Sequence, residues 1–436
     1  MQITFLGATR TVTGSKYLLS FKEKNILIDC GLFQGPSELC EKNWQPLPFK
    51  PSTLDAVILT HAHIDHRGYL PLLVKNGFSN PIFCTYGTKD LCSLLLPDSA
   101  HLQEEDAKHA NEHRHSYPSF SPLYHVSDAE NALKLMQPQP YSKIINLGTK
   151  LRAQLIPAGH IIGSSLIKLQ YHNQSILFTG DLGRLNDPVM KKPNKINKID
   201  YLVIESTYGD RLHEQEPSKL TLKNIINKTI QRGGSVIIPA FAVGRSQTLL
   251  HCLSELKKEK SIPDIPIYLD SPMAINATHI LFQHMDELRL SKDLCRELFD
   301  VAIYVRDVKE SIQLDRNKEP KIILSASGMV SGGRILFHVK EYAPDPCNTI
   351  LFTGFQSAET LGAEILSGKK FVEIHGSLVP INAHVESIGS ISAHADYSEI
   401  LTWLNEFQEP PRKTFITHGE LNASFSLKNK IETQLG

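Results

Sequence analysis

The chain has 436 residues, of which 41% are hydrophobic and 21% charged, the composition of a folded globular protein with room for about two domains. Lys and Arg together number 46, as do Asp and Glu, so the formal net charge is zero. This balance excludes a general electrostatic attraction to nucleic acid or membrane. Any site for a polyanion must therefore carry its positive charge locally.

The cysteines and the hydropathy pattern bear on the cellular compartment. The seven cysteines form no CxxC pair, and their odd number argues against a disulfide framework. The first residues lack the basic and then apolar pattern of a signal peptide, and no run of about 18 apolar residues predicts a transmembrane helix. We expect a cytoplasmic protein without membrane contact, and a homodimer is left open.

Short apolar runs that end in Gly, Asp or Thr-His dominate the first 207 residues, and they predict buried strands. These runs cover residues 2–7, 16–21, 25–31, 56–60, 165–172, 174–181 and 198–207. Between them, residues 69–75 and 88–115 are expected to be helical. This part of the chain therefore predicts sheets covered by helices, with polar residues at the strand ends.

From about residue 215, helices and apolar strands alternate, which predicts a mostly parallel sheet of βαβ type. The expected helices are 220–231 and 246–257, and the expected strands lie within 233–241, 265–272, 321–327 and 348–355. Polar strand ends then return at 387–396 and 413–420, with a helix over 398–407 between them. The simplest organisation is a first domain (1–207) that is interrupted by a second (208–375) and completed by residues 376–436.

The strongest chemical signal is the segment AVILTHAHIDHRGYLP, in which His61, His63, Asp65 and His66 directly follow a predicted strand. Imidazoles two residues apart can converge on one ion, while the Asp and His just beyond them can turn to a second. Imidazole nitrogens and carboxylate oxygens are the ligands that zinc takes in proteins. This spacing predicts a metal site.

Three further residues of metal-binding type occupy equivalent positions at strand ends. His160 follows LIPAG, Asp181 follows SILFTG, and His418 follows TFIT, each of them beside a glycine. Taken singly, such an Asp is often a turn residue and such a His is often structural. Their joint occurrence with the HAHIDH segment favours one shared metal centre.

The HAHIDH segment resembles the HxHxDH signature of the metallo-β-lactamase superfamily, and Asp29, His160 and Asp181 resemble its other motif positions in the same order. YLVIESTYG, ISAHAD and FITHGE are similar to the three extra motifs of the β-CASP nucleases. Their bacterial and archaeal members, relatives of the endonuclease subunit of the cleavage and polyadenylation specificity factor, are the most similar. The resemblance implies an α/β fold: a metallo-β-lactamase αββα sandwich with an inserted β-CASP domain of mostly parallel βαβ type.

The resemblance also implies roles for individual residues. One zinc ion would be held by His61, His63 and His160 and the other by Asp65, His66 and His418, with Asp181 bridging both and a shared hydroxide as nucleophile. Asp29 would orient a ligand of the HAHIDH segment. Glu205 would keep His394 protonated, so that His394 donates a proton to the leaving 3′ oxygen. Together, the resemblance implies catalytic roles for His394, Glu205, Asp65 and Asp181.

The substrate is expected to be single-stranded RNA. His418 points to RNA because this motif tends to be His in the RNA-processing members of the family. Candidate substrate contacts in the insertion are Arg245, at a predicted helix start, and Ser325, Ser327, Gly333 and Arg334 in the segment ASGMVSGGR. Ordinary strand–turn–helix packing explains these five residues equally well.

The sequence therefore predicts a zinc-dependent endoribonuclease, and it leaves alternatives. A 5′→3′ exoribonuclease would use the same centre. A small-molecule hydrolase of the same superfamily, such as a thioesterase or lactonase, would have a short connection after Glu205 instead of the long segment that precedes His394. An RNA-binding protein whose nuclease centre is inactive would have lost metal ligands, and all the expected metal ligands are present. Three other histidines (His338, His375 and His384) are expected to lack carboxylate partners and to be structural.

Overall fold

The computed structural model describes residues 1–436 except 23, 114–120, 149, 214–217, 355 and 358. The chain forms two compact units. We call the first one the sandwich unit, and it comprises Met1–Asn186, Lys192–Leu212 and His394–Gly436. We call the second one the inserted unit, and it comprises Asp187–Lys191 and His213–Ala393.

The sandwich unit contains two six-stranded sheets. The first has the strand order β1 (Gln2–Phe5), β2 (Tyr17–Ser20), β3 (Asn25–Ile28), β4 (Ala56–Ile58), β5 (Ile82–Cys84) and β6 (Met136–Pro138). The second has the order β20 (Lys413–Ile416), β11 (Tyr201–Ile204), β10 (Gln174–Phe178), β9 (Ser165–Tyr171), β8 (Leu151–Pro157) and β7 (Ile144–Gly148). Strands β3 to β6 are parallel to one another, as are β10, β11 and β20.

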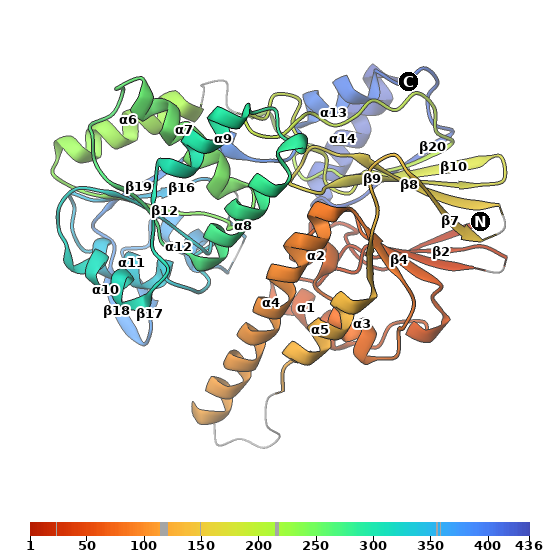
Figure 1. Cartoon of the computed structure of the whole chain (residues 1–436), viewed down its shortest axis with the longest axis horizontal. Helices are drawn as coiled ribbons and strands as arrows, with labels where there is room; N and C mark the ends of the chain where they lie inside the picture. Colours follow the sequence, from red (N-terminus) through yellow and green to blue (C-terminus); the bar gives the residue numbers. More distant parts are fainter. Residues whose placement is uncertain (23, 114–120, 149, 214–217, 355, 358) are drawn as a thin grey trace. The chain divides into compact units, whose positions relative to one another are not determined.

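The alternation of side chains along β10 explains how the second sheet is covered on both faces. Ile176 and Phe178 lie in a buried cluster with Ile58 of the first sheet, whereas Leu177 between them packs with Trp403 and Leu427 of two C-terminal helices. Successive side chains of a strand point to opposite faces, so a continuous apolar run is what a doubly covered strand requires. Figure 1 shows α13 (Tyr397–Leu404) and α14 (Leu421–Gln434) over this sheet.

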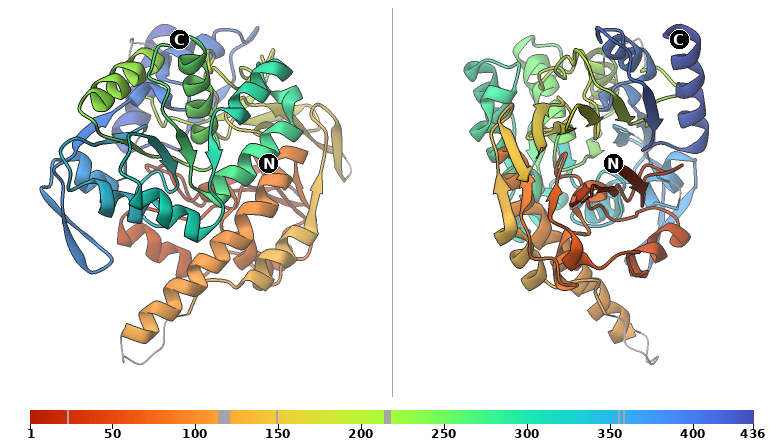
Figure 2. Two further views of the ribbon diagram at one scale, coloured as in Figure 1. Left: turned by 60° about the vertical axis from the view of Figure 1, so that its left-hand side comes forward. Right: turned by 90° about the vertical axis from the view of Figure 1, so that its right-hand side faces the viewer.

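Helices of the N-terminal half cover the outer face of the first sheet (Figure 1), which completes the αββα order. They are α2 (Ile64–Arg67), α3 (Leu70–Lys75), α4 (Tyr86–His113) and α5 (Val126–Leu135). Three shorter turns precede them: α1 (Ser37–Cys40), η1 (Glu41–Trp44) and η2 (Pro51–Thr53). Helix α4 is the expected helix over 88–115, although residues 114 and 115 lie outside the described residues; it runs beside α5 in both views of Figure 2.

The inserted unit contains a six-stranded sheet in which every strand pairing is parallel. Its strand order is β14 (Ile303–Tyr304), β13 (Ile267–Leu269), β15 (Ile322–Ser325), β12 (Val236–Pro239), β16 (Thr349–Phe352) and β19 (His384–Ser387). Its helices are α6 (Ser218–Gln231), α7 (Arg245–Lys258), α8 (Pro272–Gln283), α9 (Lys292–Asp300), α10 (Val308–Arg316), α11 (Ile335–Tyr342) and α12 (Leu361–Leu366). A hairpin of β17 (Phe371–Ile374) and β18 (Ser377–Pro380) and the turns η3 (Met285–Glu287) and η4 (Gly389–Ile391) complete it.

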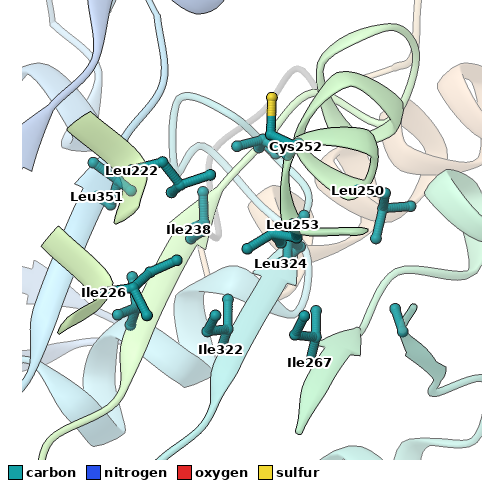
Figure 3. Close-up of a cluster of buried hydrophobic side chains, with 14 of the residues drawn as sticks. Leu222, Ile226, Ile238, Leu250, Cys252, Leu253, Ile267, Ile322, Leu324 and Leu351 are labelled. Atoms are coloured by element: carbon teal, nitrogen blue, oxygen red, sulfur yellow. The ribbon is translucent and has the colours of Figure 1, made fainter. Parts of the chain in front are cut away.

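Apolar side chains on both faces of this parallel sheet form its core. On one face, Ile238 and Leu324 pack against Leu222 of α6 and Leu253 of α7, as Figure 3 shows. On the other face, Ile237 lies in a second buried cluster with residues of α10 and α11. A parallel sheet that is covered by helices on both faces requires strands with apolar side chains on both faces. The prediction of a mostly parallel βαβ insertion is confirmed.

The inserted unit extends further along the chain than residues 208–375. It continues to Ala393 because β19 pairs with β16 through the register Thr349↔His384 to Phe352↔Ser387. The sequence of β19, HVES, lacks the apolar alternation of a half-buried strand, since β19 lies at the edge of the sheet. Among the described residues, none of the helices combines the length and the hydropathy that crossing a membrane requires.

Candidate metal centre

The metal-type residues of the sandwich unit meet at one edge because the strands that precede them end there. Asp29 follows β3 and His61 follows β4, two parallel neighbours of the first sheet. His160, Asp181 and His418 follow β8, β10 and β20, which run in the same direction in the second sheet. Parallel strands bring their carboxyl ends to the same edge of a sheet, so residues far apart in the chain become neighbours.

The first group consists of three histidines and one carboxylate oxygen. His61 Nε2 lies 3.1 Å from His63 Nδ1, and His160 Nε2 lies 3.2 Å from the same atom. Oδ2 of Asp181 is 3.3 Å from His61 Nε2 and 3.4 Å from His160 Nε2. The four ligand atoms therefore surround one point, at spacings that suit a single cation.

The second group consists of Asp65, His66 and His418. The Nε2 atoms of His66 and His418 lie 3.1 Å apart, and His418 Nε2 is 3.1 Å from Oδ2 of Asp65. The other oxygen of Asp181, Oδ1, faces this group at 3.2 Å from His66 Nε2 and 3.5 Å from His418 Nε2. Asp181 thus presents one oxygen to each group.

Oδ1 of Asp181 is buried and accepts no hydrogen bond from any described residue. A buried carboxylate oxygen without a partner is costly, and a cation would satisfy it. Imidazole nitrogens and carboxylate oxygens are also the donor set of zinc sites. On this observation and on the chemistry of the donors, the residues fit a metal cofactor.

Asp29 and Thr60 orient two of the histidines through contacts with the ring nitrogen Nδ1. Oδ2 of Asp29 lies 2.7 Å from His66 Nδ1, and Thr60 donates to Asp29 from its backbone N at 2.7 Å and from its hydroxyl at 2.8 Å. The Thr60 hydroxyl also lies 3.0 Å from His61 Nδ1. Gly180 makes room for it, because a Cβ there would lie 2.6 Å from Thr60 Cβ. The sequence interpretation overlooked Thr60. Its position directly before His61 is the feature of the sequence that could have indicated this role.

Glu205 and His394 form a pair beside the first group. His394 Nδ1 lies 3.2 and 3.3 Å from the two oxygens of Glu205, and its Nε2 is 3.9 Å from Oδ2 of Asp181. Glu205 is fully buried and also accepts the backbone N–H of Leu182 at 2.6 Å and that of Thr207 at 3.2 Å. The carboxylate is therefore fixed, and it holds Nδ1 of His394 while Nε2 faces Asp181.

Burial and charge set different pKa values within this one cluster of histidines. Burial, assisted by the neighbouring charge of His61, lowers the pKa of His63 to about 3, and burial also lowers those of His61 and His160. Burial acts in the same direction on His394, but the carboxylates of Glu205 and Asp181 outweigh it and raise the pKa to about 9. The first group thus favours neutral imidazoles, the form that binds metals, and His394 favours the protonated form.

Comparison with known proteins agrees with this geometry. Residues 18–205 match the metallo-β-lactamase superfamily domain, 246–365 the Beta-Casp domain, and 378–436 the Zn-dependent metallo-hydrolase RNA specificity domain. Ribonuclease TTHA0252 of Thermus thermophilus is 36% identical over 429 residues, which cover 96% of this chain and 93% of that protein. The chain belongs to the β-CASP family of the metallo-β-lactamase superfamily.

Other relatives of this β-CASP protein include the transcription termination factor FttA of Methanosarcina mazei. It is 31% identical over 456 residues, which cover all of this chain and 69% of that protein. Among solved structures, a protein of unknown function from Enterococcus faecalis has a TM-score of 0.55 at 13% identity, with 97% of this chain and 95% of that chain covered. This last likeness concerns the fold alone.

The five candidate substrate contacts of the β-CASP protein lie at the carboxyl side of the parallel sheet in the inserted unit. Arg245 begins α7 and lies over the ring of Phe241, at 5.3 Å. The hydroxyl of Ser327 lies 3.0 Å from that of Ser331, and Gly333 has a positive φ of 79°. These positions follow the ends of β12 and β15, as expected for strand–turn–helix connections.

Ser325 and Arg334 make contacts inside the inserted unit. Ser325 Oγ donates to the backbone oxygen of Asp270 at 2.7 Å. Arg334 donates from Nη1 to Oδ1 of Asp270 at 2.5 Å and from Nη2 to the backbone oxygen of Arg306 at 2.7 Å. These contacts support a structural role for Ser325 and Arg334, which is the alternative that the sequence left open.

The expectation that His338 lacks carboxylate neighbours is wrong. Its Nε2 lies 2.9 Å from Oδ2 of Asp270 and its Nδ1 lies 2.6 Å from Oδ1 of Asp315. Ser311 donates to the same Oδ2 of Asp270 at 2.5 Å. Asp270 and Asp315 are 68 and 23 residues away in the chain, so the sequence did not reveal this ion cluster, in which His338 and Asp270 are fully buried.

The charge on His338 is expected to make the inserted unit less stable at high pH. Burial lowers its pKa, but the hydrogen bonds with Asp270 and Asp315 outweigh burial and raise it to about 9. A histidine in the unfolded chain titrates near 6.5, so the stabilisation is complete below that pH and is lost as the pH rises through about 9. The charge on His338 contributes on the order of 3 kcal/mol to the free energy of unfolding below about pH 6.5. Hydrogen–deuterium exchange of α10 and α11, corrected for the intrinsic rate, should show protection falling between pH 7 and 9.5.

His338→Gln is the variant that tests this expectation. It should lower the protection at pH 7 and remove most of the further fall at higher pH. His384→Gln, at an exposed histidine of the same unit, is the matched control. An unchanged pH dependence in His338→Gln would contradict the assignment of the titration to His338.

Proposed function

We propose that this chain is a ribonuclease that binds two zinc ions and cleaves single-stranded RNA endonucleolytically. One observation carries the proposal: Asp181 presents Oδ2 to one histidine group and Oδ1 to the other, with the His394–Glu205 pair beside it. A carboxylate between two cation sites and a proton donor next to them are the parts that hydrolysis of a phosphodiester requires.

The proposed ligands follow the two groups. One zinc ion would be held by His61, His63 and His160 and the other by Asp65, His66 and His418, with Asp181 contributing to both. When bound, the two zinc ions would make water acidic enough to attack near neutral pH and would neutralise charge on the phosphate. Asp29 and Thr60 keep the rings of His66 and His61 turned so that Nε2 of each faces Asp181, where it would be available to a cation.

His394 is the proposed proton donor to the leaving 3′ oxygen. Nδ1 is occupied by the Glu205 carboxylate, so Nε2 is the atom from which a proton would be transferred. The pKa of about 9 keeps the ring protonated at neutral pH, and positive charge in the neighbouring groups would lower this pKa toward the pH of the reaction. A donor whose pKa is close to the ambient pH is the most effective general acid.

Four observations favour RNA as the substrate. The matched RNA specificity domain, 378–436, contains His394 and His418, and the relative from Thermus thermophilus is named a ribonuclease. The third β-CASP motif has histidine here, at position 418, which the sequence interpretation associated with RNA-processing members. The net charge of zero agrees with a substrate whose phosphate is bound by cations in the centre instead of by an extended basic surface.

The direct test measures whether the protein cleaves RNA and whether cleavage stops when metal is removed. Purified protein is incubated with end-labelled single-stranded RNA and with DNA of matched sequence, with and without a chelator and with zinc added back. We expect metal-dependent cleavage of RNA and little cleavage of DNA. Circular RNA of the same sequence separates the two modes of attack, because only an endonuclease can open it. Intact circular RNA beside degraded linear RNA would indicate a 5′→3′ exonuclease, and intact RNA in every arm would exclude the proposed function.

A further inference from the structure

Thr207 contacts the histidine at the end of the neighbouring strand. It follows β11, and β11 pairs with β20 in parallel register, so the loop after β11 runs beside His418. Thr207 Oγ1 lies 3.1 Å from Nδ1 of His418 and donates to the backbone oxygen of His418 at 3.3 Å. One hydroxyl thus contacts both the ring and the main chain of a single residue.

The two contacts define which nitrogen of His418 carries the proton. A hydroxyl has a single hydrogen to donate, and the carbonyl oxygen of His418 can only accept, so the contact at 3.3 Å assigns that hydrogen to the carbonyl. Toward Nδ1 the hydroxyl can then act only as an acceptor, so Nδ1 must carry a hydrogen. In a neutral imidazole the other nitrogen, Nε2, is then unprotonated. Nε2 is the atom that faces Asp65 and Asp181.

The main chain of His418 needs such support. Its φ is +50°, the left-handed conformation, which costs a non-glycine residue roughly 1–2 kcal/mol. Ser206 N donates to its oxygen at 3.1 Å, and its own N donates to Ala8 O at 2.8 Å. Gly419 packs so closely on Ser206 that a Cβ would lie 2.1 Å from Ser206 Oγ. These contacts hold the backbone, and Thr207 adds the contact that reaches the ring.

We propose that Thr207 is a positioning residue that sets the ring orientation and the Nδ1–H tautomer of His418, so that Nε2 is free to bind a cation. The inference rests on the proposed function and deepens it. Partners of this kind orient histidine ligands in metal sites. His66 has the Asp29 carboxylate in the corresponding place, whereas His418 has a hydroxyl. Thr207 also donates its backbone N–H to Glu205 at 3.2 Å, which links the second group to the His394–Glu205 pair.

The test compares Thr207→Val, which keeps the shape and loses the hydroxyl, with Thr207→Ser, which keeps the hydroxyl. Zinc affinities are measured by competition with a chromophoric chelator, and zinc per chain is counted after dialysis. We expect Thr207→Val to bind one of its two zinc ions about 10- to 100-fold more weakly. The other ion should keep its wild-type affinity. Thr207→Ser should stay within about threefold of wild type. Excess zinc should restore most of the RNA cleavage by Thr207→Val.

Several outcomes would overturn the inference. Wild-type affinity for both ions in Thr207→Val would do so, as would an equal loss in Thr207→Ser, because the hydroxyl would then not be the reason. Thr207→Ala serves the same comparison if circular dichroism shows that Thr207→Val does not fold. If wild-type protein holds zinc and cleaves RNA while Thr207→Val binds both ions normally, this inference fails and the proposed function stands. Wild-type protein without zinc would overturn both.

Discussion

His394→Ala is expected to keep both zinc ions and to cleave single-stranded RNA about 10²- to 10⁴-fold more slowly than wild type, the range that a general acid contributes. The metal should remain because His394 belongs to neither ligand group, and its Nε2 lies 3.9 Å from the nearest oxygen of Asp181. The rate should fall because the variant lacks the proton that the Glu205 carboxylate holds on the ring. Zinc is counted by inductively coupled plasma mass spectrometry, and cleavage is followed under single-turnover conditions.

A substrate with a better leaving group sharpens this test. If His394 protonates the leaving 3′ oxygen, an RNA with sulfur at that bridging position needs little protonation, so the defect of His394→Ala should become much smaller on it. His172→Asn is a matched control, because His172 is exposed in the sandwich unit and Asn tolerates its φ of +52°. Cleavage of ordinary RNA by His394→Ala at the wild-type rate would show that His394 is not the acid. Loss of zinc from this variant would assign His394 to the ligands instead.

Asp181→Ala is expected to lose both zinc ions and, with them, RNA cleavage. Among the described residues, Asp181 alone has one oxygen facing each group, at 3.2–3.5 Å from four histidine nitrogens. Removing it deletes a ligand from each group and also the negative charge that would offset the repulsion between two cations bound close together. Metal ions stabilise the transition state by several kcal/mol, so their loss should lower the rate by at least about 10³-fold.

His63→Ala provides the comparison for Asp181. It removes a ligand from the first group alone, so about one zinc ion per chain should remain after dialysis, against about two in the wild type and none in Asp181→Ala. Circular dichroism establishes that each variant is folded. Two zinc ions in Asp181→Ala would contradict the bridging role of this carboxylate.

Several properties of this protein followed from local sequence patterns. The apolar runs correspond to strands β3, β4, β10, β11 and β20, because a buried strand needs continuous apolar side chains over a few residues. The HAHIDH segment places four ligand-type side chains within six residues, so its metal-binding character did not depend on the rest of the fold. The resemblance carried by the motifs then predicted the partners of this segment, and the structure brings His160, Asp181 and His418 to it.

Other features depend on contacts between residues that are distant in the chain. The carboxylates that flank His338 come from positions 270 and 315, and no spacing within a single element predicts such partners. The strand β19 was missed because it lies at a sheet edge and has polar residues, although its pairing with β16 extends the inserted unit to Ala393.

By itself, then, the sequence determined the apolar strands that precede the metal-type residues and the residue types at their ends, because these depend on side chains within a few residues of one another. Only the tertiary structure decided that Asp181 offers a separate oxygen to each group, and that Thr60 and Thr207 hold the rings of His61 and His418. Such contacts depend on the register of neighbouring strands and on the direction of hydroxyl and carboxylate groups. Packing of the whole unit sets both of these.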